Sequence, residues 1–489
     1  MSSKKDSILT KSRIMAWRQC AKRLWLETYR PELARKSDAQ EALFETGRRV
    51  GEIARDQNPG GFLIETLTRE KALAQTAEFM SSERRPLFEG AFSAEGIFIR
   101  ADVLLPEGRG WHMVEVKSST KVKPYQQEDA AIQKYVLQTA GVSVVRTSIA
   151  VIDTGFVYQG CGDYTGLLRY FDVSDSIQLL ALSAREWGQN AEVTLSRPEP
   201  DIETGKQCTE PHECQFRAYC SAGTSQKIFP VSILPHSFHL SETLQREGYE
   251  DIRDVPESRL SNPIHKRIRR VTCSGQAELD TAAKSILASL AWPRRYIDFE
   301  TLGDAIPRWP GTRPFQQIPF QWSCHTEYPD GRLYHEGFLA PHDGEDPRLA
   351  FIRTLLNVCG TDGPLLVWNA SFERTRIMEL AHTFGEYQDS LLRLESRLVD
   401  LLPIARNHYY HPEMRGSWSI KSVLPTIAPE LNYDELDIGD GGSAQWAYAR
   451  LLDASAPTDQ KNEIAEALRI YCERDTLAMV RVARYLEGR

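Results

Sequence analysis

Apolar and polar positions repeat with two different periods in the C-terminal part of the chain. Residues 296–301 alternate with the period of two that is typical of a half-buried strand. Side chains alternate between the two faces of a strand, so Asp298 and Glu300 should share one face while their neighbours point into the core. The apolar run 364–367 predicts a second, buried strand, and residues from about 460 to 486 follow the helical period.

Two carboxylates on one strand face raise each other's pKa unless a cation lies between them. A divalent metal ion would remove this conflict, and hard oxygen ligands suit Mg²⁺ or Mn²⁺. Two surface acids on a strand edge are the alternative interpretation of this short pattern.

Further acidic residues follow in an order that favours the metal site. Asn369 is expected to be the N-cap of the next helix, which places Glu373 in the first helical turn. Tyr471 and Asp475 are four residues apart in the helical stretch, so they share one helix face. A carboxylate and a phenol able to orient a water molecule would then face the same cleft.

Asp-x-Glu, Asn-x-x-Phe-Glu and Tyr-x-x-x-Asp resemble, in this order, the three motifs of the ribonuclease H-like DEDD exonucleases of the tyrosine subtype. The resemblance covers residues 292–489 and implies two-metal 3′-to-5′ exonuclease chemistry. It assigns the metal ligands to Asp298, Glu300, Glu373 and Asp475, and the positioning of water to Tyr471. The family usually has aspartate where this chain has Glu373. For Asp400 we expect a helix-capping or surface role rather than a supporting role in the site.

The N-terminal part contains a second acidic pattern. Two apolar strands, 96–105 and 111–117, flank a Pro/Gly turn and predict a hairpin. Glu115 and Lys117 share a strand face, and the hairpin can bring Asp102 beside them. Two carboxylates would bind a metal ion, and the ammonium group could orient water or stabilise phosphate charge. Without further support, ordinary surface charges of a hairpin would be the better explanation of this pattern.

A split set of cysteines provides that support. Cys20 lies within residues 9–29, whose apolar spacing predicts one helix capped by Thr10 or Ser12. Three evenly spaced cysteines follow much later in a loop-rich stretch, at Cys208, Cys214 and Cys220. Four thiolates suit either zinc or an iron–sulfur cluster, and the spacing does not separate the two.

Hairpin and cysteines together resemble the PD-(D/E)XK nuclease superfamily, in particular its RecB-like branch with an iron–sulfur cluster. In that branch one cysteine precedes the nuclease core and three follow it. The resemblance assigns the nuclease motif to Asp102, Glu115 and Lys117, the glutamine of the following helix to Gln133, and a 4Fe-4S cluster to the four cysteines. The chain departs from the family at Gly51, which replaces a frequent metal-binding histidine, and at Tyr135, two residues after the glutamine instead of four.

The length of the chain indicates over how many domains these motifs are distributed. At roughly 150 residues per domain, the 489 residues predict about three parts of an α/β protein. We place the nuclease-like domain with its cluster at 1–225, a helical linker region at 226–290, and the ribonuclease H-like domain at 291–489. A polar start at residues 1–6 and the lack of a long apolar run predict a cytoplasmic protein without a membrane partner.

Charge limits how nucleic acid can be held. The net charge of −8 gives no general basic surface, so contacts with phosphates would need local patches. The most basic run, 265–270, is either a solvated helix face or a surface that contacts phosphates.

The whole arrangement, including stretches 417–425 and 440–444, resembles a bacterial family of uncharacterised proteins that fuse the two nuclease domains. We therefore expect a metal-dependent nuclease that acts on single-stranded nucleic acid, with DNA favoured and RNA possible. Two alternatives remain open. In the first, the N-terminal domain is an inactive nucleic-acid-binding module for the exonuclease. In the second, the chain is a structural or redox-sensing protein that carries a cluster.

Overall fold

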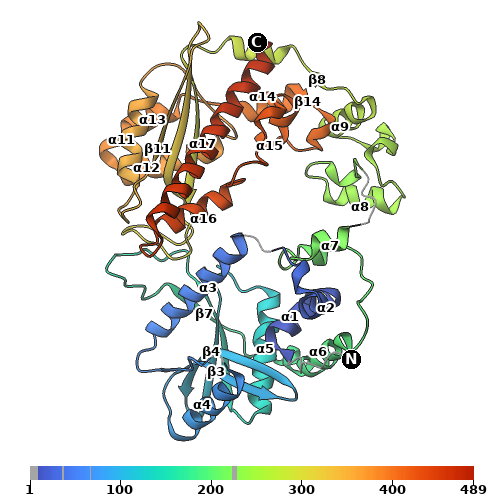
Figure 1. Cartoon of the computed structure of the whole chain (residues 1–489), viewed down its shortest axis with the longest axis vertical. Helices are drawn as coiled ribbons and strands as arrows, with labels where there is room; N and C mark the ends of the chain where they lie inside the picture. The colour runs from blue at the N-terminus through green and yellow to red at the C-terminus, as the bar shows by residue number, and fades with distance from the viewer. Residues whose placement is uncertain (1–8, 36–37, 67, 223–227) are drawn as a thin grey trace. The chain divides into compact units, whose positions relative to one another are not determined.

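The computed structural model shows a mixed α/β protein (Figure 1) and describes residues 9–35, 38–66, 68–222 and 228–489. The N-terminal residues 1–8, expected to be polar, lie outside the described residues. The chain forms two compact units. The first comprises Met1–Thr224 and Asp304–Gln316, and the second Ser225–Gly303 and Gln317–Arg489. The region 226–290 therefore belongs to the second unit. No helix in the described ranges is both long and apolar enough to cross a lipid bilayer.

The first unit contains a mixed sheet with the strand order β2-β3-β4-β5-β6-β7, in which β1 also pairs with β4. Its strands are β1 (Leu9–Thr10), β2 (Phe62–Leu63), β3 (Leu87–Ala94), β4 (Ile97–Glu107), β5 (Gly110–Val116), β6 (Val144–Ile152) and β7 (Leu168–Asp172). Strands β4 and β5 are antiparallel, with Val103 opposite Val114, so the predicted hairpin is confirmed. Strand β6 then pairs with β5 in parallel.

Apolar side chains cover both faces of this sheet. Its helices are α1 (Lys11–Gln19), α2 (Ala21–Tyr29), α3 (Asp38–Asp56), α4 (Arg69–Ser82), α5 (Pro124–Thr139), α6 (Gln178–Leu195) and α7 (Arg217–Ser221). One core cluster joins the sheet to Ile14 of α1, Ile132 of α5 and Trp187 of α6. The opposite cluster combines Val50 of α3 with Ile306, which comes from the segment 304–316.

The single helix expected over residues 9–29 is wrong. The structure has β1 first and then two helices, α1 and α2, separated at Cys20. This residue is extended, with φ −164° and ψ 124°, and such a backbone cannot continue a helix. Thr10 caps α1 as expected, accepting a hydrogen bond from the N–H of Arg13 at 3.3 Å. The apolar stripe runs through both helices, which is why periodicity alone did not reveal the break.

The second unit contains a five-stranded mixed sheet with the order β11-β10-β9-β12-β13. Its strands are β9 (Arg294–Leu302), β10 (Ile318–Glu327), β11 (Leu333–Leu339), β12 (Leu365–Val367) and β13 (Leu398–Asp400). Strands β9, β10 and β11 are antiparallel, whereas β12 runs parallel to β9 and β13. The predicted strands at 296–301 and 364–367 are therefore confirmed. A small separate sheet pairs β8 (Glu278–Leu279) with β14 (Tyr409–Tyr410).

Helices pack on both faces of this second sheet (Figure 1). They and the remaining helices of the unit are α8 (Phe238–Arg246), α9 (Pro263–Ser274), α10 (Ala282–Ala288), α11 (Arg348–Cys359), α12 (Ser371–Thr383), α13 (Gln388–Glu395), α14 (Leu401–His408), α15 (Ile420–Val423), α16 (Gly441–Leu451) and α17 (Thr458–Glu487). Phe299 on one face packs in a core with α11, α12 and α13. On the other face lies α17, which confirms the helix predicted over 460–486.

A buried ion pair joins the beginning of β9 to the end of α17. Arg294 is 1% exposed and its guanidinium contacts the Glu487 carboxylate at 2.9 and 3.2 Å. The same guanidinium donates to the carbonyl of Leu287 at 2.7 Å and lies 3.9 Å from the centre of the Trp292 ring. Burial raises the pKa of the Glu487 carboxyl, but the hydrogen bond and charge of Arg294 outweigh it and lower the pKa. This pair fixes α17 along the strand that carries Asp298 and Glu300.

We predict that Glu487→Ala lowers the free energy of unfolding of the second unit by about 3–5 kcal/mol, because the buried guanidinium is left without its partner. Chemical denaturation of the full chain measures this change. The matched control is Glu430→Ala, which removes an exposed pair with Arg481 and should cost no more than about 1 kcal/mol. Equal effects of the two substitutions would contradict the structural role of the buried pair.

Candidate functional site

Four acidic side chains from three elements meet beside the sheet of the second unit. Asp298 and Glu300 lie on β9, on the face opposite the core residue Phe299. Glu373 is in the first turn of α12, as predicted, and Asp475 lies on α17. The charges of Asp475, Glu300 and Glu373 all act on Asp298, so the structure brings the four predicted acids together.

Burial and mutual repulsion make this group unstable as four bare anions. Burial raises the pKa of Glu300 to about 8, with the charge of Asp475 next in effect. Burial also raises the pKa of Glu373 to about 8, and raises those of Asp298 and Asp475. The Oε2 atom of Glu373 is buried and has no hydrogen-bond partner among the described residues. Oxygen atoms with these properties are the donor set that a divalent cation prefers.

The predicted tyrosine lies beside a lysine that the sequence analysis did not identify. The ammonium of Lys421 donates to the Tyr471 hydroxyl at 3.0 Å and to the Gly439 carbonyl at 2.6 Å. It also lies 4.9 Å from the ring centre of Tyr471 and 5.1 Å from that of Tyr433. Burial, followed by the charge of Asp475, raises the pKa of Tyr471, which keeps it a phenol. Lys421 was inside the stretch 417–425 already singled out, but nothing in its spacing indicated a place in the site.

Tyr433 is a second residue that the sequence analysis missed. It follows a short 3₁₀ helix in a loop, and its hydroxyl donates to Asp475 Oδ1 at 2.5 Å. The hydrogen bond holds the carboxylate of α17 in one orientation. A lone tyrosine in a loop carries no periodic signal, so only the folded chain could show this contact.

Asn369 does not cap α12 as expected. Its backbone is left-handed, with φ +72°, and Ala370 occupies the N-cap position. Asp400 instead holds the residues just before α12: its carboxylate accepts hydrogen bonds from the N–H groups of Asn369 and Ala370, at 3.0 and 3.1 Å. The same carboxylate caps α14 through the N–H of Leu402 at 3.0 Å. The capping role expected for Asp400 is therefore confirmed.

A thiol completes the surroundings of the acidic pair. Within the described part of the chain, one group of three potential metal-ligand atoms lies within 4.8 Å of one another, and it consists of Asp298, Glu300 and Cys472. Cys472 is fully buried on α17, and its sulfur lies 4.0 Å from the backbone carbonyl oxygen of Asp298. The sequence analysis passed over this cysteine because it sits between the two motif residues.

The first unit brings its four predicted nuclease residues together. Asp102 lies on β4, Glu115 on β5, Lys117 directly after β5 and Gln133 on α5. The Lys117 ammonium contacts Glu115 Oε1 and Asp129 Oδ2, each at 2.6 Å. Gln133 donates to Glu115 Oε2, and Asp102 Oδ2 accepts from the N–H of Val116 at 2.8 Å.

Three charged side chains of this site were not predicted. Lys11, the first residue of α1, contacts Glu115 Oε1 at 3.0 Å and Asp129 Oδ1 at 3.1 Å. Glu89 lies on β3 with a left-handed backbone, φ +54°, and its side chain lines the cavity beside Asp102. Lys11 and Glu89 escaped prediction because long-range packing brings them to the hairpin, whereas the third, Asp129, lies four residues before Gln133 on the same face of α5 and could have been found from that spacing.

The two ammonium groups change the electrostatics of this site. Burial and the charge of Asp102 raise the pKa of Glu115, but Lys11 and Lys117 outweigh them, so the pKa is lowered overall. Burial raises the pKa of Asp102, against the same two lysines. In contrast to the second unit, the first therefore neutralises its acids with its own side chains.

A cavity of about 290 Å³ opens beside these residues. Its walls come from α3 and the sheet, and they include Gly51, Arg55, Glu89, Asp102 and Glu115. A side chain at Gly51 would meet only Arg55 Nη1, at 3.8 Å from its Cβ. The expected histidine position is thus open space within the cavity.

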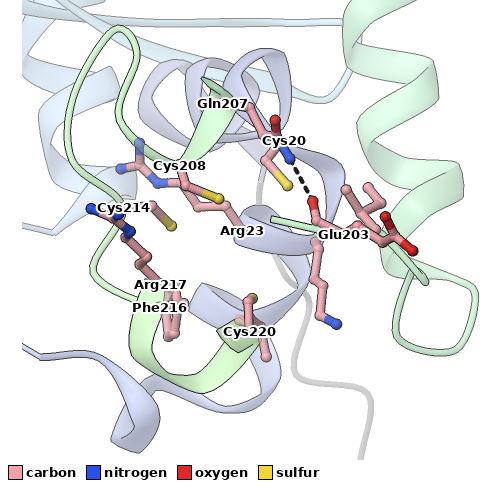
Figure 2. Close-up of a pocket in the computed structure, with 12 residues that line it drawn as sticks. Cys20, Arg23, Glu203, Gln207, Cys208, Cys214, Phe216, Arg217 and Cys220 are labelled. Carbon is pink, nitrogen blue, oxygen red and sulfur yellow. Dashed lines mark hydrogen bonds between the residues drawn. The ribbon is translucent and has the colours of Figure 1, made fainter. Parts of the chain in front are cut away.

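The four predicted cysteines surround one small cavity of about 10 Å³ (Figure 2). Cys20 lies between α1 and α2, Cys220 is in α7, and Cys208 and Cys214 come from the loop before it. All four are free thiols, and Figure 2 shows their side chains around a common space. Burial raises the pKa of Cys214 and of Cys220, and the neighbouring cysteines add to this. The helix break at Cys20 therefore serves to place its thiol opposite the other three.

The basic run 265–270 lies on α9 and is largely engaged within the unit. Arg267 is buried and donates to the carbonyl of Asn407 at 2.6 Å, and Arg269 donates to the carbonyl of Val255. Arg270 pairs with Glu278 at 2.6 Å. Arg267 and Arg269 are thus occupied by backbone carbonyls, whereas Arg270 remains on the solvated surface.

Comparison with known sequences identifies one domain family and several distant relatives. The family described as "Domain of unknown function (DUF2779)" matches residues 295–419, which include Asp298, Glu300 and Glu373. Uncharacterized protein UU173 of Ureaplasma parvum serovar 3 is 26% identical over 236 residues, which are 44% of this chain and 34% of that protein. Uncharacterized protein MG366 of Mycoplasma genitalium is 28% identical over 215 residues, 39% of this chain and 32% of that protein. The chain thus spans about a third of the length of these relatives, and its similarity to the DUF2779 family is confined to residues 295–419.

Proposed function

We propose that this protein is a metal-dependent nuclease and that its second unit is a 3′-to-5′ exonuclease. The observation that carries the proposal is the convergence of Asp298, Glu300, Glu373 and Asp475 from β9, α12 and α17 in one buried group. Their order and residue types resemble the DEDD motifs, and the five-stranded mixed sheet between helices agrees with a ribonuclease H-like fold. The direction of degradation, from the 3′ end towards the 5′ end, rests on that resemblance.

The residues fit Mg²⁺ or Mn²⁺. Glu373 Oε2 is a buried carboxylate oxygen without a partner, and burial holds the pKa of both glutamates well above the usual range. When bound, such ions activate a water molecule and stabilise the leaving oxygen of a phosphodiester. Tyr471 would orient the water through its hydroxyl, which Lys421 holds in place from the other side. Tyr433 fixes the carboxylate of Asp475.

The substrate we favour is single-stranded DNA, with RNA as the alternative. The net charge of −8 and the internal contacts of the basic run 265–270 leave little general attraction for a duplex. A strand end held by its backbone and by stacked bases needs fewer positive charges.

We predict that Asp475→Asn abolishes progressive shortening of 5′-labelled single-stranded DNA in Mn²⁺. A loss of about a thousandfold or more is expected, since a metal ligand contributes several kcal/mol to the transition state. The product ladder on a sequencing gel measures it, first with DNA and then with RNA. The control is Glu466→Gln, an exposed acid on the same helix, which should keep the ladder. A progressive 3′-to-5′ ladder that forms in Asp475→Asn at the rate of the native protein would refute the assignment of this site.

We propose a second nuclease site in the first unit, at Asp102, Glu115, Lys117 and Gln133. The cavity of about 290 Å³ next to Asp102 and Glu115 has room for a phosphate group. One observation favours the alternative of a binding module. Both oxygens of Glu115 are already engaged, Oε1 by Lys11 and Lys117 and Oε2 by Gln133, so a metal ion must displace a partner.

We predict residual Mn²⁺-dependent cleavage in Asp475→Asn, and its loss when Lys117→Met is added. Lys117 supplies the only ammonium of the predicted motif, and its removal should reduce the residual rate at least about a hundredfold. Lys121→Met, an exposed lysine nearby, is the control. Absence of residual cleavage, together with weaker DNA binding in Lys117→Met, would reject the second nuclease site and support the binding module.

For the four cysteines we propose a 4Fe-4S cluster. Four sulfur atoms around one zinc ion would be about 3.8 Å apart, given Zn–S bonds of about 2.3 Å. No three of these sulfur atoms are within 4.8 Å of one another, although all four line one cavity. The choice of a cluster over a single zinc ion rests on the resemblance to the RecB-like branch. The proposed cluster would lie where α1, α2, α7 and the loop between residues 205 and 216 meet.

We predict that anaerobically purified protein is brown, with broad visible absorption that Cys214→Ser abolishes. The chain offers a control in Cys161→Ser, which changes an exposed thiol of the same unit and should keep the colour. Iron and zinc are counted in the same samples. A colourless native protein with one zinc ion per chain would contradict the cluster.

A further inference from the structure

The exonuclease proposal leaves Cys472 without a role, although this thiol is part of the same site. Its sulfur and one carboxylate oxygen each of Asp298 and Glu300 lie within 4.8 Å of one another. At present the thiol can donate only a weak hydrogen bond, to the backbone carbonyl of Asp298 at 4.0 Å. A fully buried thiol beside two metal-binding carboxylates alters which metal ions the site can hold.

Sulfur changes the preference of a metal site. Mg²⁺ and Mn²⁺ favour oxygen ligands, whereas thiolate ligands select thiophilic ions such as Zn²⁺. A tetrahedral zinc ion with one sulfur and two carboxylate oxygens requires these atoms to be about 3.5 Å apart. The three atoms already lie within 4.8 Å, so small side-chain rotations bring them to that separation.

A further carboxylate, that of Glu373, acts on this group, although it is not one of the three ligand atoms within 4.8 Å of one another. Glu373 acts electrostatically on both Asp298 and Glu300, is 2% exposed, and has a buried Oε2 atom without a hydrogen-bond partner. One sulfur and three carboxylate oxygens would complete a tetrahedron around zinc.

We propose that Cys472, Asp298 and Glu300 form a site for thiophilic divalent cations, zinc in particular, which overlaps the site of the catalytic metal ions. On binding, the S–Zn bond replaces the S–H bond and the proton is released to solvent. As far as it concerns catalysis, this inference rests on the proposed exonuclease function. There it makes zinc an inhibitor, because a thiolate-bound ion excludes Mg²⁺ or Mn²⁺ from the same carboxylates.

The test uses Cd²⁺, which reports thiolate binding through its ultraviolet charge-transfer absorption. Before the titration, the four-cysteine site of the full-length protein is filled with its iron–sulfur cluster. The added ultraviolet absorption then reports Cd²⁺ binding by the other thiols. Native protein should bind one equivalent of Cd²⁺ with this absorption, and Cys472→Ser should lose it.

The matched control is Cys359→Ser. Cys359 is also fully buried in the second unit, but it lies in the apolar core between the sheet and α11 and outside the metal-ligand group. This variant should keep the absorption. A Cd²⁺ signal that persists in Cys472→Ser, or that never appears in the native protein, overturns the proposal.

A second variant covers the case in which Cys472→Ser does not fold. Asp298→Asn keeps the shape of the side chain but removes a charged ligand, so it should weaken Cd²⁺ binding at least about tenfold. Unchanged affinity in that variant would mean that the thiol binds cadmium without the carboxylates, which also contradicts the site.

Activity gives an independent measurement. With Mn²⁺ held constant, Cys472→Ser should raise the Zn²⁺ concentration needed for half-inhibition at least about tenfold. Equal inhibition of both proteins by zinc would reject the role of the thiol while leaving the exonuclease intact. If neither protein degrades nucleic acid, the proposed function fails, and the Cd²⁺ titration still decides whether the thiol site exists.

Discussion

The second unit depends on one electrostatic constraint: four carboxyl groups, three of them buried and that of Asp298 half-buried, must be held close together although their charges repel. Packing rather than attraction enforces this arrangement. Because Ile297 and Phe299 enter the core on one face of β9, Asp298 and Glu300 must point to the opposite face. Asp475 is brought to them by α17, whose last residue, Glu487, is fixed to the first residue of β9 by the Arg294 ion pair. The free energy of the apolar core is thereby used to keep an unfavourable charge group in place, and the group becomes favourable when a cation joins it.

The first unit solves the same problem in the opposite way. Its acids face two ammonium groups, Lys11 and Lys117, which lie within 3.1 Å of Glu115 and Asp129. Internal neutralisation stabilises the fold without an added ion, but it also occupies oxygen atoms that a metal would need. The second unit leaves Glu373 Oε2 without a hydrogen-bond partner among the described residues and places Lys421 beside its tyrosines. A bound cation would therefore stabilise the second site more than the first, although both sites consist of acids on neighbouring strands and helices.

Local patterns in the sequence predicted the elements and the motif residues, because strand and helix periods decide which side chains share a face. The pairs Asp298 with Glu300, Glu115 with Lys117, and Tyr471 with Asp475 all follow from such spacing. Lys11, Tyr433 and Lys421 could not be found in this way, since each reaches its site through contacts between distant segments. The break at Cys20 was hidden for a related reason: the apolar stripe continues across it, and the extended backbone depends on where the thiol must point.

The segment 304–316 has a consequence for how the protein is made. It is synthesised after β9, yet Ala305 and Ile306 are part of the core that also contains Val50, Val103 and Val114 of the first unit. During synthesis that core remains incomplete until residue 316 has left the ribosome. By then β9, the first strand of the second unit's sheet, has already emerged. The two units are therefore interleaved along the chain. No single cut separates them cleanly, and recombination between genes would have to transfer them as one piece.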